Sequence, residues 1–117
     1  MAESPTQRTL RALEQRGCIC GIVERYNSFA GPFGRRFDLF GFIDIIALYP
    51  NQIVGIQSCG ASFSQHYKKI IENDRAFEWL KLGGIELWGW RKVKKKRGGK
   101  LMIWKPRLHI FAEGDFK

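Results

Sequence analysis

Residues 41–48, GFIDIIAL, and residues 53–60, IVGIQSCG, decide the fold of this chain. Both stretches are short, apolar and rich in β-branched residues, as buried strands are. The turn signal Tyr49-Pro50-Asn51 separates them, so we expect the two strands to pair antiparallel. The first stretch carries a single acid, Asp44, and the second carries Gln57 near its end. A carboxylate is costly in such a run unless a cation lies beside it, and a metal ion or an arginine would meet that need.

The sequence on either side predicts an α+β domain with a mixed central sheet. Ser4-Pro5-Thr6-Gln7 has the pattern of a helix start, and Gly17 is expected to end this first helix. A second helix should begin near Ser62 or Ser64 and break at Asn73-Asp74, where Asp74 would cap a short third helix. The remaining elements are expected as strands over residues 18–26, from 37 or 39 to 48 (the central strand), 53–58, 85–93 and 101–111, a loop over 27–34 and the third helix over 76–82.

Length and composition indicate one globular domain spanning residues 1–117. Hydrophobic residues make up 44% of the chain, but no apolar run is long enough to span a bilayer, and no N-terminal signal pattern is present. We therefore expect no membrane partner. Of the three cysteines, Cys18 and Cys20 lack zinc-ligand spacing and are expected to be small core groups. A reducing, cytoplasmic location is the corresponding expectation.

The positive charge is concentrated in two places. The net charge is +9, and seven of the ten residues from 91 to 100 are basic while none is acidic. This block lies in an expected hairpin over residues 85–111 and points to a polyanion, with nucleic acid as the first candidate. The alternative is a polar turn that keeps a sheet edge soluble. The candidate phosphate contacts are Lys94, Lys95, Lys96, Arg97 and Lys100 in this hairpin, and Arg35 and Arg36 in a basic loop near Asp44.

The tryptophans near this block allow two interpretations. Trp88 and Trp90 lie on one face of their expected strand, and Trp104 would face them from the next strand if the register allows. They either stack on exposed bases or pack beneath the helices.

The order of elements, with an acid in the second strand and a polar pair ending the third, resembles the PD-(D/E)XK nuclease superfamily. The similarity is to small Holliday-junction resolvases and related phage and bacterial proteins. Residues 43–48, IDIIAL, are similar to that family's PDIIAL strand, with Ile43 in place of the proline. Residues 56–59, IQSC, lie where the family has an apolar residue followed by (E/D)-x-K. The resemblance implies a restriction-endonuclease-like fold (α/β/α-like) and a metal-dependent DNA endonuclease, with branched DNA as a candidate substrate.

The resemblance also implies a site that binds Mg²⁺ (or Mn²⁺), which activates water for phosphodiester hydrolysis. Asp44 matches the family's aspartate, and Gln57 stands at the position of the second acid. Glu24 on the first strand is a candidate replacement ligand. The glutamate that resolvases carry on the first helix is matched by Gln7, or less well by Glu14.

Cys59 stands where the family has its lysine, and a thiol cannot do the work of a lysine. Lys68 or Lys69, on the following helix, is the candidate replacement, and His66 is another possible proton carrier. Asp38 is six residues from Asp44, which is roughly 20 Å along an extended strand. The two acids could bind one ion only if the chain bends at Gly41.

The sequence leaves three hypotheses about function open. The first is the endonuclease, which by analogy with the family would act as a homodimer because a Holliday junction has two-fold symmetry. The second is a catalytically degraded nuclease fold that only binds DNA. The third is an unrelated basic α+β domain, for which RNA is as good a ligand as DNA. The alternative for Asp44 is a salt bridge with Arg35, Arg36 or another basic group instead of a bound metal.

Overall fold

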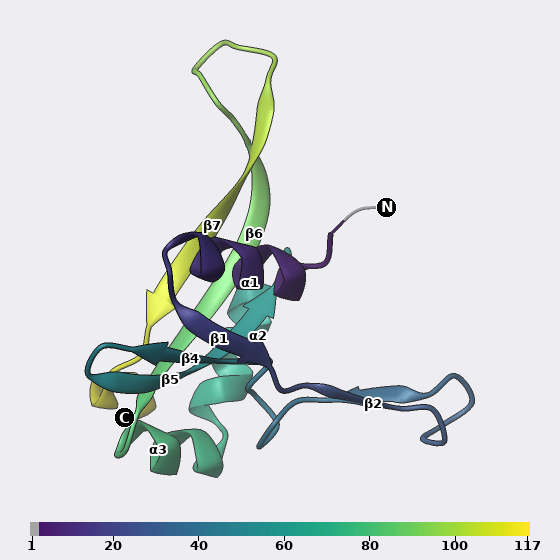
Figure 1. Ribbon diagram of the computed structural model, residues 1–117, viewed down its shortest axis with the longest axis vertical. Helices are drawn as coiled ribbons and strands as arrows, with labels where there is room; N and C mark the ends of the chain where they lie inside the picture. The colour runs from purple at the N-terminus through teal and green to yellow at the C-terminus, as the bar shows by residue number, and fades with distance from the viewer. Residues whose placement is uncertain (1–2) are drawn as a thin grey trace.

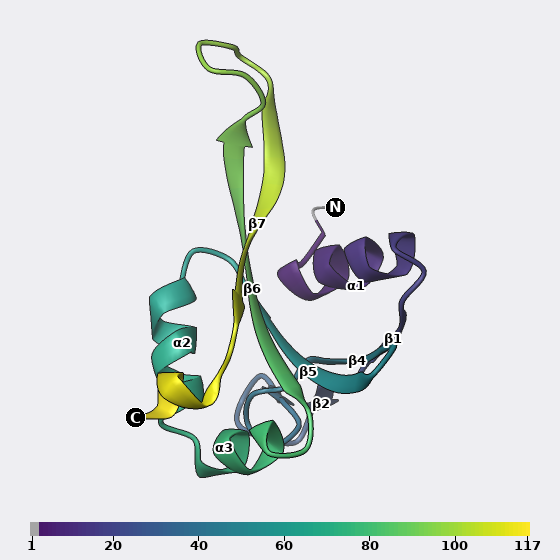
Figure 2. The same ribbon diagram turned by 90° about the vertical axis from the view of Figure 1, so that its left-hand side faces the viewer.

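The computed structural model describes residues 3–117, and its centre is a five-stranded mixed sheet with helices on both faces (Figures 1 and 2). The sheet has the strand order β1-β4-β5-β6-β7. Its strands are β1 (Ile19–Ile22), β4 (Ile45–Tyr49), β5 (Gln52–Cys59), β6 (Gly84–Lys94) and β7 (Met102–Ile110). The first three in this order pair antiparallel, β5 and β6 pair parallel, and β6 and β7 pair antiparallel. The predicted α+β class, the mixed sheet and the antiparallel pairing of the two deciding stretches are confirmed.

Helix α1 (Pro5–Gln15) begins as its sequence predicts. The Ser4 side chain accepts a hydrogen bond from the Gln7 backbone N–H at 3.1 Å, and Pro5 occupies the first helical position. After the helix, Gly17 adopts a φ of 77°, a left-handed conformation that favours glycine. The chain then turns directly into the edge strand β1.

Two helices form the crossover that a parallel pair of strands requires. These are α2 (Phe63–Ile71) and α3 (Asp74–Leu80), which lie between β5 and β6 in the chain. The break falls at Asn73-Asp74 as predicted, but the cap residue is Asn73, whose side-chain oxygen accepts from the Arg75 and Ala76 backbone N–H groups. The expectation that Asp74 caps this helix is wrong, because Asp74 is already its first helical residue.

The core has one layer on each face of the sheet. Figure 2 shows α1 on one side and α2 and α3 on the other. On the α1 side, Trp88 and Trp90 are buried, and the Trp90 indole donates a hydrogen bond to Thr9 Oγ1 at 2.8 Å. The prediction that these two tryptophans pack beneath a helix is confirmed. Trp104 pairs with Lys92 in the register and remains 42% exposed, with the Arg8 guanidinium 3.9 Å from the centre of its ring.

The structure corrects the strands expected over residues 18–26 and 37–48. The chain leaves the sheet after β1, forms a separate antiparallel hairpin from β2 (Arg25–Asn27) and β3 (Arg35–Phe37), and re-enters the sheet at β4. A tight turn at Phe40 (φ 55°) and Gly41 (φ 83°) precedes this return. The middle strand of the sheet is therefore β5, and not the stretch that ends at residue 48.

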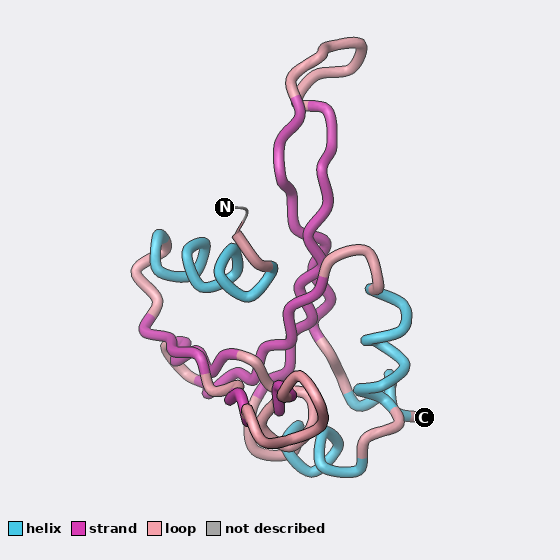
Figure 3. Tube along the Cα trace, turned by 90° about the vertical axis from the view of Figure 1, so that its right-hand side faces the viewer, coloured by secondary structure: helices cyan, strands magenta, loops and turns pink. Residues whose placement is uncertain are grey.

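Two hairpins project from the body of the protein in Figure 1, and Figure 3 shows the longer of them, in magenta, extending above the helices. One is the β2–β3 hairpin, residues 25–37, and the other is the long β6–β7 hairpin, residues 84–110. The loop at the tip of the second holds Lys95, Lys96, Arg97 and Lys100, all of them exposed. Along residues 3–117, no helix is both long enough and apolar enough to cross a membrane.

Candidate metal centre

Three carboxylates converge where the β2–β3 hairpin joins the sheet. Glu24 immediately precedes β2, Asp38 immediately follows β3, and Asp44 immediately precedes β4. One oxygen from each lies within 4.8 Å of the other two, which is a spacing that a single ion can bridge. The condition for Asp38 and Asp44 to share an ion is therefore met, because the chain bends at Phe40 and Gly41. We call these three residues the acid cluster.

Backbone hydrogen bonds hold the acid cluster together. The carbonyl of Asp44 accepts hydrogen bonds from the N–H groups of Val23 and Glu24 at 2.8 and 3.3 Å. These bonds join the two ends of the segment that leaves the sheet after β1 and returns at β4. The N–H of Asp44 donates to the Ile56 carbonyl at 2.8 Å, and the N–H of Leu39 donates to the Ile43 carbonyl at 2.9 Å. These bonds fix the backbone at or next to each acid, so the fold holds the three carboxylates close together.

Asp44 is the buried member of the acid cluster, with only 3% of its surface exposed. Its Oδ2 accepts two hydrogen bonds of 2.8 Å, one from the Ser58 backbone N–H and one from the Gln57 side-chain Nε2. Among the ion pairs of the described residues, Arg36 contacts Glu24 at 4.0 Å and not Asp44. The arrangement therefore differs from the alternative in which an arginine neutralises Asp44.

Gln57 connects the buried acid to its neighbour and has one unsatisfied atom. Its Nε2 donates to Asp44 and also lies 3.4 Å from Asp38 Oδ2. Its Oε1 is buried and lacks a hydrogen-bond partner among residues 3–117. An unpaired buried oxygen costs about 1–3 kcal/mol. A half-turn of the amide would place this oxygen at the acid cluster, where it would serve as a neutral metal ligand.

The electrostatics of the acid cluster favour a shared proton when no metal is bound. Burial, hydrogen bonding with Asp38 and the negative charges of Asp38 and Glu24 raise the pKa of Asp44 to about 9, against the lowering effect of the Ser58 N–H. Burial alone would raise the pKa of Asp38, but hydrogen bonds from Asp44 and Gln57 and the charge of Lys69 lower it. The two carboxyls therefore hold a proton between them. A divalent cation bound to the same oxygens would replace that proton.

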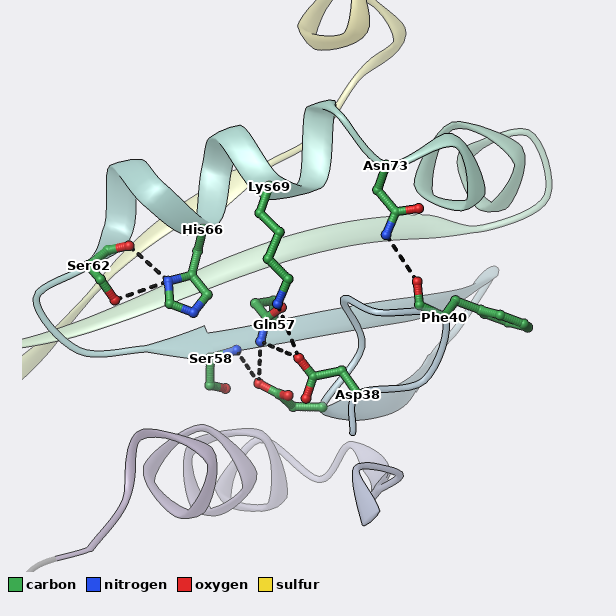
Figure 4. A network of polar contacts seen from close by, with 9 residues as sticks. Asp38, Phe40, Gln57, Ser58, Ser62, His66, Lys69 and Asn73 are labelled. Atoms are coloured by element: carbon green, nitrogen blue, oxygen red, sulfur yellow. Dashed lines mark hydrogen bonds and ion pairs between the residues drawn. The ribbon is translucent and has the colours of Figure 1, made fainter. Parts of the chain in front are cut away.

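The structure brings Lys69, and not Lys68, to the acid cluster. Lys69 Nζ lies 3.5 Å from Asp38 Oδ2, and Figure 4 shows it extending from α2 toward that carboxylate. Lys68 points elsewhere, with its Nζ 4.0 Å from Glu72 and its side chain 73% exposed. His66 precedes Lys69 by three residues, and its Nδ1 lies 2.8 Å from the Ser62 carbonyl and 3.0 Å from Ser62 Oγ. The side chains of Lys69 and His66 both extend from the side of α2 that faces β5 (Figure 4).

Cys59 does not replace the missing lysine, and the first helix supports the site through a residue other than Gln7 or Glu14. Burial, followed by the charge of Asp44, raises the pKa of Cys59 to about 11, so the thiol is neutral at pH 7. Gln7 and Glu14 are exposed on α1. The residue through which α1 supports the site is Thr9, whose hydroxyl accepts from Ser58 Oγ at 2.9 Å. Sequence reasoning did not single out Thr9, although its i,i+4 spacing from the apolar Leu13 places it on the buried face of the helix.

A basic cavity of about 680 Å³ adjoins the acid cluster at Asp38. We call it the cationic cavity. Its positively charged lining consists of Arg25, Arg35, Arg36, Lys69 and Arg75. Arg35 and Arg36 were candidate phosphate contacts from the sequence, whereas Arg25 and Arg75 were not. Arg75 belongs to α3, so only the tertiary structure brings it to the other four.

Comparison of the chain with protein-family models, with curated proteins and with solved structures gives no match.

In the metal-free protein, the free energy of unfolding is expected to fall as the pH rises from about 4 to about 9. The folded state keeps a proton on Asp44 up to a pKa of about 9, whereas the unfolded chain loses it near pH 4. Unfolding in this interval releases a proton, so each pH unit destabilises the fold by up to about 1.4 kcal/mol. Urea denaturation in EDTA at several pH values measures the slope. The Asp44→Asn variant should lose most of it, and equal slopes in both proteins would contradict this prediction.

Proposed function

We propose that this chain is a Mg²⁺- or Mn²⁺-dependent DNA endonuclease of the PD-(D/E)XK type. The observation that carries the proposal is the acid cluster itself: three carboxylates from separate positions meet beside the side-chain amide of Gln57, whose Nε2 faces Asp44 and whose Oε1 is buried without a partner among the described residues. Oxygen ligands of this kind suit Mg²⁺ and Mn²⁺. The cationic cavity beside them suits a phosphate backbone.

The connectivity supports the restriction-endonuclease-like fold that the resemblance implies. One helix precedes three consecutive antiparallel strands of the main sheet, two crossover helices follow, and the next strand pairs parallel to the third. Asp44 immediately precedes the second of these strands, and Gln57 lies in the third. These are the places where the resemblance puts the two metal ligands.

The mechanism assigns a role to each group around the acid cluster. Asp44, Asp38 and Glu24, with the oxygen of Gln57, would hold the ion. When bound, Mg²⁺ activates a water molecule and offsets the charge that develops on the phosphate. Lys69, beside Asp38, is placed to hydrogen-bond the attacking water or a phosphate oxygen. The arginines of the cationic cavity would position the DNA backbone through bidentate contacts.

The long β6–β7 hairpin would extend the contact with DNA away from the acid cluster. Its basic candidates are Lys94, Lys95, Lys96, Arg97 and Lys100, and all are exposed. Each phosphate that such a side chain neutralises adds affinity that decreases with salt concentration.

We further propose that the protein acts as a homodimer through β7. This strand lies at the edge of the sheet and exposes Ile103, Trp104, Leu108 and Ile110 by 37%, 42%, 42% and 66%. The exposed apolar side chains of this edge strand, which lie on both sides of Lys105-Pro106-Arg107, would pack against those of a second copy, which creates the two-fold symmetry of a branched substrate. Ile110→Lys should convert the dimer to a monomer in light-scattering measurements without loss of the fold. A wild-type protein that is monomeric at all concentrations would contradict this.

The experiment that tests the proposed function is a cleavage assay on linear duplex, single-stranded and four-way-junction DNA. Each substrate is incubated with Mg²⁺ or Mn²⁺ and in parallel with EDTA, and binding of the same substrates is measured by gel shift. Cutting that requires the metal supports the endonuclease. Tight, salt-sensitive binding without cutting supports the degraded nuclease-fold DNA-binding module. RNA of equal length is tested in parallel. RNA that binds as tightly as DNA, without cutting of either, supports the third interpretation, an unrelated basic α+β domain.

A further inference from the structure

We propose that the tip of the β2–β3 hairpin is an aromatic wedge that enters the base stack of DNA at a branched or distorted position. The wedge consists of Phe29 and Phe33. The inference rests on the proposed function, in that the hairpin adjoins the acid cluster, but it concerns how the substrate is recognised and not how it is cut.

The two phenylalanines are exposed to an unusual degree. Phe29 is 95% exposed and Phe33 is 90% exposed, at positions four residues apart in the same tip. Exposed apolar residues scattered singly are common on protein surfaces, but two nearly uncovered aromatic rings on one projecting tip are a candidate contact surface. Figure 1 shows that the hairpin extends away from the sheet, so no other element of the described chain covers its end.

The tip is an ordered structure that presents these side chains. The Tyr26 hydroxyl donates to the Phe33 carbonyl at 2.7 Å, and the Asn27 side-chain oxygen accepts from the Phe29 N–H at 2.9 Å. The Tyr26 phenol also lies where a side chain on residue 34 would be, so this position requires glycine, and Gly34 has a φ of 78°. The side chains of Tyr26 and Asn27 are therefore used within the tip, while the rings of Phe29 and Phe33 stay almost fully exposed among the described residues.

The positive charge of the β2–β3 hairpin favours DNA as the ligand of the aromatic tip. From residue 25 to residue 37 the chain contains three arginines, Arg25, Arg35 and Arg36, and no acid. All three line the cationic cavity at the base of the hairpin. An aromatic tip on an arginine-bearing stem matches DNA, whose phosphates attract the stem and whose bases accept an apolar wedge where stacking is weakened.

The connection to the acid cluster sets the distance between wedge and scissile phosphate. Glu24 immediately precedes the hairpin and Asp38 immediately follows it. Phe29 is five residues from Glu24 and Phe33 is five residues from Asp38. Five residues of extended chain span at most about 17 Å, which is about five nucleotide steps of 3.4 Å. Cleavage is therefore expected within about five nucleotides of the point where the wedge opens the stack.

The test measures base unstacking and binding in a background that does not cut. Four-way junctions carry the fluorescent base 2-aminopurine at the branch point, and the protein carries Asp44→Asn. We expect fluorescence to increase on binding, because the reporter base loses its neighbour. Adding Phe29→Ala and Phe33→Ala should abolish this increase and weaken junction binding about 10- to 100-fold, since stacking is lost. Binding to intact duplex should change less than about 3-fold.

The matched control is Leu82→Ala, because Leu82 is 92% exposed but lies outside the hairpin. It should leave both the fluorescence and the affinity unchanged, and circular dichroism should show all variants folded. Equal weakening of duplex and junction binding, or an unchanged fluorescence signal, would overturn the wedge. Phe-dependent binding to vesicles of anionic lipid with no effect on DNA would also overturn it, in favour of a membrane. Because the assay requires no cutting, a failed cleavage assay and a failed wedge remain distinguishable.

Discussion

The Asp44→Asn variant is expected to lose metal-dependent DNA cleavage by about 1000-fold or more. Asparagine keeps the size of the side chain, and its oxygen can still accept hydrogen bonds from the Ser58 N–H and Gln57 Nε2, which are 2.8 Å from the carboxylate. The change removes the buried negative charge that the ion requires. Loss of several kcal/mol of transition-state stabilisation by the metal corresponds to this factor. Single-turnover cleavage at saturating enzyme measures it.

The same variant should bind DNA as tightly as the wild type in EDTA. In EDTA at neutral pH, Asp44 already carries a proton, so the substitution leaves the charge of the acid cluster, and with it the attraction of the phosphate backbone, unchanged. Retained binding separates a catalytic defect from a folding defect. A variant that binds normally and still cuts at the wild-type rate would rule out Asp44 as a metal ligand.

Two adjacent lysines provide a matched comparison for the same reaction. Lys69→Ala is expected to slow cleavage about 100-fold, because only Lys69 reaches Asp38, at 3.5 Å. Lys68→Ala should change the rate less than about 3-fold, because Lys68 contacts Glu72 on its own helix. Equal effects of the two substitutions would mean that their positive charge matters only for general attraction of DNA.

The second large effect concerns stability: Thr9→Val is expected to reduce the free energy of unfolding by about 3 kcal/mol. The Thr9 hydroxyl is fully buried, accepts from Trp90 Nε1 at 2.8 Å and Ser58 Oγ at 2.9 Å, and donates to the Pro5 carbonyl at 3.0 Å. Valine has the same shape but leaves these buried groups unpaired, at about 1–3 kcal/mol for each that finds no new partner. The midpoint of thermal unfolding should fall by about 10 °C.

Thr6→Val is the control for this substitution, because Thr6 lies on the same helix and makes none of these three hydrogen bonds. It should cost less than about 1 kcal/mol. If both variants unfolded at the same temperature, the hydroxyl network of Thr9 would contribute nothing specific. Since Ser58 also donates its backbone N–H to Asp44, a lower metal affinity in Thr9→Val would show that α1 supports the acid cluster.

The amino-acid sequence determined the features of this protein that depend on short-range patterns. Alternating and continuous apolar runs predicted the α+β class and the antiparallel pairing of β4 and β5, and the Ser4-Pro5 signal predicted the start of α1. Asp44 was identified as the central acid because a lone carboxylate in an apolar strand is costly without a partner. All of these follow from the chemistry of a few neighbouring residues.

Only the tertiary structure decided which groups stand beside Asp44. The chain leaves the sheet as the β2–β3 hairpin and returns through a turn in which Phe40 has a positive φ. Because non-glycine residues rarely adopt a positive φ, sequence patterns do not predict this turn. This path brings Asp38 within reach of Asp44, although an extended strand would separate them by roughly 20 Å. The orientation of α2 about its axis points Lys69 toward Asp38 and Lys68 toward Glu72, and this orientation also depends on tertiary packing. Long-range backbone hydrogen bonds, and not local preference, stabilise these positions, so the sequence alone could name the candidates but not their convergence.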